Sequence, residues 1–95
     1  MEIRNGTHPQ DAKHYTTERL REEYLIPQVF IPGGIKLVYS HVDRMIAGGA
    51  CPVNKPLTLE AGKEIGADFF LARREMGIIN IGGKGTVKLD GQSYS

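Results

Sequence analysis

The stretch from Phe69 to Gly91, FFLARREMGIINIGGKGTVKLDG, decides how the rest of the chain is interpreted. Its apolar and β-branched runs predict three strands, at 69–74, 78–81 and 86–89. The Asp-Gly pair that follows is typical of a type I′ turn, because that turn needs two residues at positive φ. A glycine cluster precedes the last strand, and its spacing predicts a tight turn between strands rather than a phosphate-binding loop.

The strand that returns from the Asp-Gly turn has only the residues from Gln92 to Ser95. A typical strand has about 5–6 residues, and an isolated hairpin is marginally stable. We therefore expect the chain to end inside a sheet, as a truncated protein would. Open strand edges favour pairing with another chain, so self-association is expected unless a partner covers them.

A second stretch, IKLVYSHVDRMIA at 35–47, is interpreted as one long strand that bends near Asp43. Side chains alternate between the two faces of a strand, so Tyr39, His41 and Asp43 are expected on one face. Polar residues of these types are unusual in a hydrophobic core. With Arg44 they form the best local candidate for a functional contribution, since Arg binds carboxylates bidentately and His titrates near neutral pH.

The first half of the chain is expected to contain an irregular N-terminal arm at 1–15 and a short helix at 17–24. A threonine hydroxyl at the start of the helix can cap its free amides, and Pro27 is expected to stop it. Proline and glycine spacing predicts the remaining short elements, which are a strand at 29–31, a turn at 32–34, an extended connection at 50–59 and a helical turn at 60–65.

The composition indicates one small globular domain, with 95 residues, 40% of them hydrophobic, and a net charge of +1. This balance excludes a disordered chain and gives no electrostatic footprint for nucleic acid. The single cysteine, Cys51, excludes an internal disulfide framework and is expected to pack as a small hydrophobic residue.

His8 and His14 lie in the expected arm and are assigned to the solvated surface rather than to a metal site. No apolar run is long enough for a membrane helix, and the N-terminus is too polar for a signal peptide. These features predict a soluble cytoplasmic protein without a membrane partner.

The spacing from Glu75 to Gly82, with an Asp-Gly turn behind it, resembles the first half of a cupin β-barrel motif. In cupins a His-x-His pair precedes the glutamate, because alternate residues of one strand can converge on a metal. The corresponding segment at 67–71 is ADFFL and has no histidine. We therefore expect a barrel without a metal, in which Glu75 pairs with Arg73, Arg74 or another cation.

Longer blocks resemble the N-terminal part of the 5-keto-4-deoxyuronate isomerase family, namely TTERLREEYLI, VYSHVDRMIAGG and FFLARREMGIINIGGKGTVKLDGQ. The resemblance implies a mainly β, cupin-like jelly-roll barrel or sandwich, incomplete in this chain, with a short helix near 17–24. It places a partial N-terminal cupin-like domain at 16–95, behind the arm. It also implies a much longer parent with two cupin barrels that assembles as a homohexamer.

The same resemblance implies a zinc-dependent ketol-isomerase of pectin and uronate breakdown. Its substrates would be 5-dehydro-4-deoxy-D-glucuronate and 3-deoxy-D-glycero-2,5-hexodiulosonate. Members of the family hold zinc through three histidines and a glutamate in the C-terminal barrel, which this chain does not contain. No catalytic residue and no metal ligand is therefore expected in this chain, which is predicted to be inactive and free of zinc by itself.

Candidates for substrate binding or for an interface remain within the chain. We favour a structural role for them, as polar links between barrels or subunits, over contact with the sugar carboxylate. They are Tyr39, His41, Asp43, Arg44, Arg74 and Glu75. The alternative to part of an isomerase is a metal-free cupin-like module that binds a sugar acid or mediates assembly.

Overall fold

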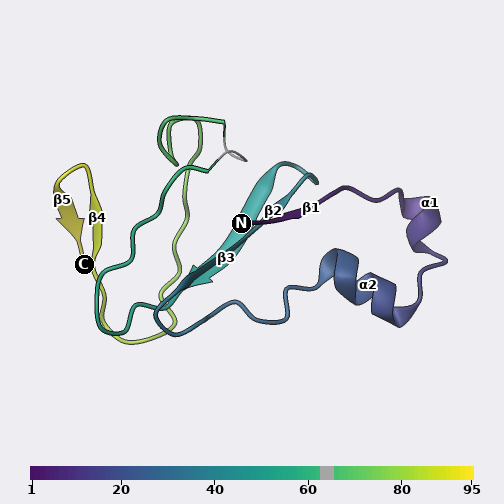
Figure 1. Ribbon diagram of the computed structural model, residues 1–95, viewed down its shortest axis with the longest axis horizontal. Coiled ribbons are helices and arrows are strands. Elements are labelled where there is room, and N and C mark those ends of the chain that lie inside the picture. The colour runs from purple at the N-terminus through teal and green to yellow at the C-terminus, as the bar shows by residue number, and fades with distance from the viewer. Residues whose placement is uncertain (63–65) are drawn as a thin grey trace.

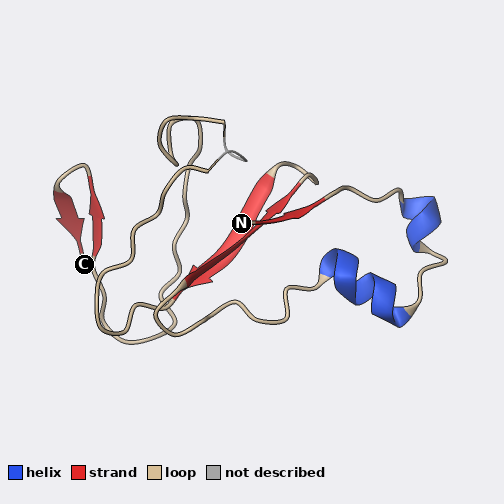
Figure 2. Ribbon diagram, in the orientation of Figure 1, coloured by secondary structure: helices blue, strands red, loops and turns tan. Residues whose placement is uncertain are grey.

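The computed structural model describes residues 1–62 and 66–95, and its regular structure is mainly β (Figure 1; Figure 2). The strands form a three-stranded sheet in the order β1-β2-β3 and a two-stranded sheet of β4 and β5. Neither sheet closes into a barrel within the described residues. The elements are β1 (Glu2–Arg4), α1 (Pro9–Ala12), α2 (Thr17–Tyr24), β2 (Ile35–Ser40), β3 (Met45–Ala50), β4 (Val87–Leu89) and β5 (Gln92–Tyr94).

The predicted single strand at 35–47 is wrong, because the chain reverses and forms an antiparallel hairpin of β2 and β3. The reversal occupies His41 to Arg44, where Asp43 and Arg44 have φ of 55° and 52°. The Ser40 hydroxyl accepts a hydrogen bond from the Val42 amide at 3.1 Å and supports the turn. The bend predicted near Asp43 lies within this reversal, where the direction of the strand changes.

The predicted irregular arm is wrong at two places. Residues Glu2–Arg4 form β1, which pairs in parallel with the Val38–Ser40 end of β2. This pairing satisfies the outer backbone groups of β2 at that end. The breaker residues His8 and Pro9 begin the short helix α1, since the His8 Nδ1 accepts a hydrogen bond from the Gln10 amide at 3.1 Å and proline suits the first helical turn.

The predicted helix at 17–24 is confirmed as α2. The Thr16 Oγ1 caps it by accepting a hydrogen bond from the Arg19 amide at 3.2 Å. No residue of α2 is buried, and the Tyr24 hydroxyl is hydrogen-bonded to the Thr7 Oγ1 in the preceding loop. Figure 1 shows α1 and α2 at the opposite end of the molecule from the β4–β5 hairpin.

The predicted turn at Pro32-Gly33 is confirmed, with Gly33 at φ 74° and the Gly34 amide bonded to the Ile31 carbonyl at 2.9 Å. The predicted strand at 29–31 is wrong, because these residues cross close to β3 instead of pairing in a sheet. A Cβ at Gly49 would lie 2.7 Å from the Val29 carbonyl oxygen, so this close approach requires glycine.

The C-terminal stretch contains less regular structure than the sequence predicted. Residues Phe70–Arg73 form a turn, and 78–81 have no regular structure, so the strands predicted at 69–74 and 78–81 are wrong. No neighbouring strand within the described residues supplies these segments with ladder hydrogen bonds. The Asp90-Gly91 hairpin is confirmed, with φ of 51° and 80° at the two turn residues.

The helical turn predicted at 60–65 is absent at 60–62, and 63–65 lie outside the described residues. Among the described helices, none is both long and apolar enough to cross a membrane. The β class is thus confirmed, whereas the jelly-roll remains a prediction.

The buried hydrophobic side chains are Val38, Tyr39 and Phe70 among the described residues. Val38 and Tyr39 are neighbours on β2 and point to opposite faces, so both faces of the central strand are covered at this point. The radius of gyration is 15.6 Å, whereas a compact chain of this length has roughly 12 Å. The chain is therefore extended around a very small core.

Candidate functional site

Among the candidate residues on the β2–β3 hairpin, Tyr39 and His41 are in contact. Tyr39 is buried at the end of β2, and the His41 ring meets it edge-on, with centroids 5.1 Å apart and an interplanar angle of 62°. Such edge-to-face contacts between rings are favourable because the positive edge of one ring meets the negative face of the other. The contact places an exposed imidazole beside a buried phenol.

Arg74 joins this hairpin to the C-terminal stretch. Its guanidinium carbon lies 5.3 Å from the centroid of the Tyr39 ring, within the range of a cation–π contact. Its Nη1 donates a hydrogen bond to the Arg44 carbonyl at 2.9 Å. One side chain therefore holds the left-handed turn at 41–44 against the segment that follows Phe70. We call Tyr39, His41, Arg44 and Arg74 the arginine-tyrosine cluster.

Two of the six candidate residues make no comparable contact. Asp43 and Glu75 are exposed, and neither takes part in an ion pair between described residues. The predicted pairing of Glu75 with Arg73 or Arg74 is therefore wrong, whereas its pairing with another cation stays a prediction. The neighbouring guanidinium of Arg74 is turned to Tyr39 and to a backbone carbonyl instead.

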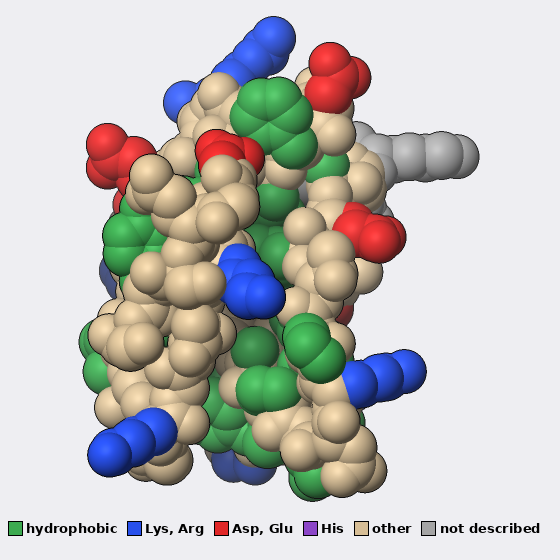
Figure 3. All heavy atoms as spheres, turned by 90° about the vertical axis from the view of Figure 1, so that its left-hand side faces the viewer, with side chains coloured by type: hydrophobic (Ala, Val, Ile, Leu, Met, Phe, Trp, Pro, Cys, Tyr) green, Lys and Arg blue, Asp and Glu red, His purple; other side chains and the backbone are tan. Residues whose placement is uncertain are grey.

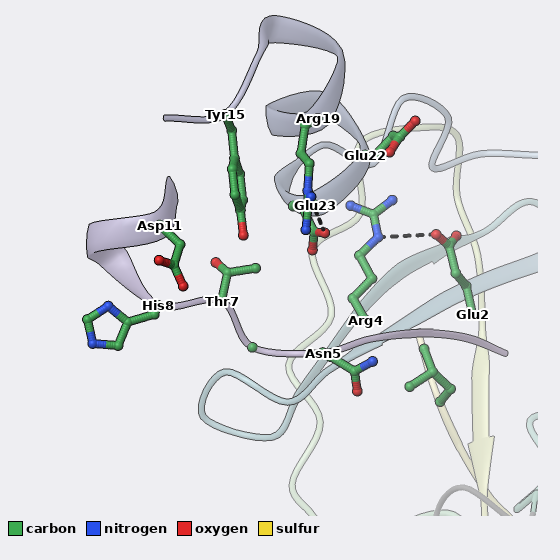
Figure 4. A pocket seen from close by; sticks show the side chains of 12 residues that line it. Glu2, Arg4, Asn5, Thr7, His8, Asp11, Tyr15, Arg19, Glu22 and Glu23 are labelled. Atoms are coloured by element: carbon green, nitrogen blue, oxygen red, sulfur yellow. Dashed lines mark hydrogen bonds and ion pairs between the residues drawn. The ribbon is translucent and has the colours of Figure 1, made fainter. Parts of the chain in front are cut away.

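A polar pocket of about 520 Å³, which the sequence analysis did not identify, lies between β1, the following loop and α2 (Figure 4). Arg4 donates to Glu2 at 3.1 Å, and the Arg19 Nε lies 3.6 Å from a Glu23 carboxylate oxygen. Arg19 also stands over the Tyr15 ring at 4.3 Å. The charged run RLREE at 19–23, which supplies Arg19, Glu22 and Glu23 to the lining, is the one sequence feature that could have indicated this pocket.

The electrostatics of this pocket centre on Glu2. The hydrogen bond from Arg4 lowers the pKa of the Glu2 carboxyl below its ordinary value of 4.5, and the Lys36 ammonium, 3.6 Å away, acts in the same direction. Both arginines that line the pocket are already paired with carboxylates of the same chain. The pocket therefore offers a ligand no unpaired arginine, and the lining carboxylates of Asp11 and Glu22 take part in none of these ion pairs.

Neither region assembles the donors of a metal centre. Within residues 1–62 and 66–95, no group of three or more His, Cys, Asp or Glu side chains could hold a metal ion. His8 serves as a helix cap through its Nδ1, and Cys51 is a half-buried free thiol. The described residues therefore do not fit a zinc site with three histidines and a glutamate.

The chain was compared with families and with curated proteins of known name. No family model matches the chain. It is similar to curated proteins named 4-deoxy-L-threo-5-hexosulose-uronate ketol-isomerase. The one from Lachnoclostridium phytofermentans is 62% identical over 94 residues, and the one from Lachnospira eligens is 56% identical over 94 residues. The one from Halalkalibacterium halodurans is 53% identical over 95 residues.

These matches cover almost all of this chain but a limited part of each relative. They include 99–100% of the chain and 34% of the length of each relative, in its N-terminal part. The chain thus spans about a third of the length of the curated relatives it matches.

Proposed function

We propose that this chain forms part of a 4-deoxy-L-threo-5-hexosulose-uronate ketol-isomerase, because it is homologous to the N-terminal third of such enzymes. The observation that carries the proposal is 62% identity over 94 residues, without restriction to a short motif. The reaction would interconvert 5-dehydro-4-deoxy-D-glucuronate and 3-deoxy-D-glycero-2,5-hexodiulosonate during cytoplasmic pectin and uronate breakdown. It moves a carbonyl between adjacent carbons by proton transfer through an enediol.

In this proposal the chain supplies scaffold rather than chemistry. A cupin-like N-terminal barrel would be completed by residues outside the matched third, and the protein would assemble as a homohexamer. Zinc would polarise the carbonyl oxygens when bound. Because the described residues do not fit a zinc site, its ligands are assigned to the rest of the enzyme. The family resemblance places the catalytic base there as well. The 95-residue chain alone is proposed to be inactive.

The arginine-tyrosine cluster is proposed to have a structural role in this enzyme. Arg74 donates a hydrogen bond to the Arg44 carbonyl and lies against the Tyr39 ring. Both contacts suit a residue that fixes the conformation of a turn. The guanidinium of Arg44 has no carboxylate partner among the described residues, so it could receive a carboxylate from another barrel or subunit. Contact of this group with the sugar carboxylate is the competing role.

These roles predict different defects in a full-length enzyme that carries His41→Ala. If the cluster is structural, hexamer content or thermal stability falls while zinc per subunit stays unchanged. Size-exclusion chromatography and metal analysis measure both. Loss of zinc from a variant that is still hexameric would contradict the structural role.

The isomerase proposal is tested with a graft, in which this chain replaces the matching segment of the Lachnoclostridium phytofermentans relative. The expected result is a folded protein whose isomerase activity on 5-dehydro-4-deoxy-D-glucuronate lies within about tenfold of that of the relative, a change of up to 1.4 kcal/mol in the activation free energy. Conversion can be followed by proton NMR. A folded graft without activity would overturn the proposal and favour a sugar-acid-binding or assembly module, which calorimetry with the same sugar would then detect.

A further inference from the structure

Asn5 and Gly6 form an Asn-Gly pair in the loop that connects β1 to α1, and both residues are exposed. Between described residues, no hydrogen bond holds the Asn5 side chain or joins the Gly6 amide to another part of the chain. Figure 4 shows the side chains of Asn5 and Arg4 on opposite sides of the backbone. The side-chain amide of Asn5 is therefore accessible to the backbone nitrogen that follows it.

An asparagine that precedes glycine can lose ammonia in a reaction that consumes only water. The glycine nitrogen attacks the side-chain carbonyl carbon of the asparagine, and the side-chain nitrogen leaves as ammonia with the proton of the glycine amide. Water then opens the five-membered succinimide at either carbonyl, which gives aspartate or isoaspartate. No atom is oxidised or reduced. Glycine favours the reaction because it has no Cβ to hinder the attacking nitrogen.

The other asparagines of the chain are less suited to this reaction. The Asn80 side chain donates a hydrogen bond to the Gly83 carbonyl at 2.9 Å and accepts one from the Gly82 amide at 3.0 Å. Isoleucine follows Asn80, and lysine follows Asn54. A side chain on the following residue crowds the attacking nitrogen, so ring closure is slower at both positions.

The Asp90-Gly91 pair can form the same ring, but its conformation and charge oppose the reaction. Both residues have positive φ, at 51° and 80°, and the pairing of β4 with β5 holds this turn. An ionised carboxylate is also a poor target for a nitrogen nucleophile. The hairpin lies at the end of the molecule that faces the viewer in Figure 3, where charged and hydrophobic side chains are both at the surface. Exposure alone therefore does not select Asn5.

The Asn5-Gly6 pair lies between two anchored points of the chain. On one side, β1 pairs with β2, and the Arg4 carbonyl accepts a hydrogen bond from the His41 amide at 2.9 Å. On the other side, the Thr7 hydroxyl is hydrogen-bonded to the Tyr24 hydroxyl of α2. Isoaspartate would add one main-chain atom to this short connection and change its direction. The three-residue strand β1 has few hydrogen bonds with which to resist that change.

We propose that Asn5 is a site of spontaneous deamidation, and that its isoaspartyl product releases β1 from β2. The reaction also adds a negative charge to the polar pocket, whose lining includes Asn5. The proposal rests on the loop at 5–6 and on the anchors of β1. It does not depend on the isomerase reaction.

Peptide mapping by mass spectrometry tests the modification in the 95-residue chain, incubated at mildly alkaline pH. Deamidation at Asn5 is expected to proceed within about fivefold of its rate in urea, because the exposed loop needs no opening. It should also exceed the rates at Asn54 and Asn80 by at least about tenfold. A rate at Asn5 no faster than at Asn54, or slowed beyond this range by folding, would overturn the proposal.

Gly6→Ala is the matched variant for the chemistry. Gly6 does not have positive φ, and a Cβ there would come no closer than 3.9 Å, to Val42, so the variant should keep the fold. The added methyl group is expected to slow deamidation at Asn5 by about tenfold or more. An unchanged rate would contradict attack by the Gly6 nitrogen.

Hydrogen exchange followed by NMR tests the release of β1. The His41 amide is expected to exchange at least about tenfold faster in the isoaspartyl form, separated from the aged chain, than in the unmodified chain. Asn5→Asp carries the same added charge on a normal backbone, and should exchange within about twofold of the unmodified chain. Amides of β3 that pair with β2 should keep their protection in all three proteins. Equal His41 exchange in the isoaspartyl and unmodified forms would overturn the release, as would an equally fast Asn5→Asp variant.

Discussion

The β1-β2-β3 sheet and the stretch from 66 to 95 contain similar residue types. They differ in how many of these residues are buried and in how many form hydrogen bonds with a neighbouring strand. In the sheet, β2 is hydrogen-bonded on both edges and buries Val38 and Tyr39. In the later stretch, the apolar run at 78–81 consists of three isoleucines and one asparagine, yet Phe70 is the one buried hydrophobic residue described. An apolar, β-branched sequence therefore forms a strand only where a neighbouring strand is available to it.

Among the variants considered, Tyr39→Ala in the 95-residue chain should have the largest effect on the free energy of unfolding. The substitution empties a buried site and removes the ring beneath Arg74, so unfolding should become easier by about 3 kcal/mol. Tyr94→Ala on exposed β5 is the matched control and should change stability by less than about 1 kcal/mol. Urea denaturation followed by circular dichroism measures both. Equal effects would show that the two regions are equally packed.

Gly48→Ala should have the next largest effect. An added Cβ would lie 1.9 Å from the Lys36 carbonyl oxygen of the paired strand, so the backbone must shift at a cost of about 2 kcal/mol. Gly83→Ala is the counterpart in the later stretch, where a Cβ would meet nothing within 4 Å. That variant should be neutral or about 0.5 kcal/mol more stable. The same denaturation curves decide the point, and a tolerated Gly48→Ala would mean that β2 and β3 are less closely apposed.

Thr16→Ala should produce a smaller loss, about 1 kcal/mol, because it removes the hydroxyl that caps α2. Helix content at 222 nm and hydrogen exchange of the α2 amides report on the cap directly. Thr86→Ala, an exposed threonine beside β4, serves as the control and should lie within about 0.5 kcal/mol of the unmodified chain. Unchanged exchange in Thr16→Ala would argue against the cap.

The titration of Glu2 should give the smallest effect. Its folded pKa is lowered by the hydrogen bond from Arg4, so the associated stabilisation is present above pH 4.5 and is lost as the pH falls through the lowered value. Carbon-detected NMR of the Glu2 carboxyl follows the titration. Arg4→Gln should move the midpoint up toward 4.5, whereas Lys88→Gln on β4 should leave it in place. A titration midpoint of Glu2 that is the same in Arg4→Gln as in the unmodified chain would contradict the ion pair between Arg4 and Glu2.

Elements defined by local chemistry could be predicted from the sequence. The α2 helix follows from its threonine cap, the turn at Pro32-Gly33 from proline and glycine, and the last hairpin from Asp90-Gly91. Each depends on interactions within a few residues. A bend was predicted near Asp43, but the sequence pattern could not distinguish a bent strand from a hairpin, since side chains alternate with the same period in both.

Elements defined by distant partners could not be predicted. The pairing of Glu2–Arg4 with β2 depends on a strand far along the chain, and no local signal marks it. The strands predicted at 69–74 and 78–81 are wrong because their composition favours strands, but the described residues include no neighbouring strand for them to pair with. At the candidate site, the proximity of Tyr39 and His41 was expected from one face of a strand, whereas the Arg74 contact crosses the fold.

The parallel position of β1 has a consequence for the order in which the sheet assembles. Ser40 and Met45 of the hairpin are near neighbours in the chain, so β2 and β3 can meet after a short loop closes. Ile3 reaches Tyr39 only when the whole connection through α1 and α2 has been ordered, which carries a larger loop-closure entropy. The hairpin should therefore be the folding nucleus, with β1 the last strand to dock and the first to leave.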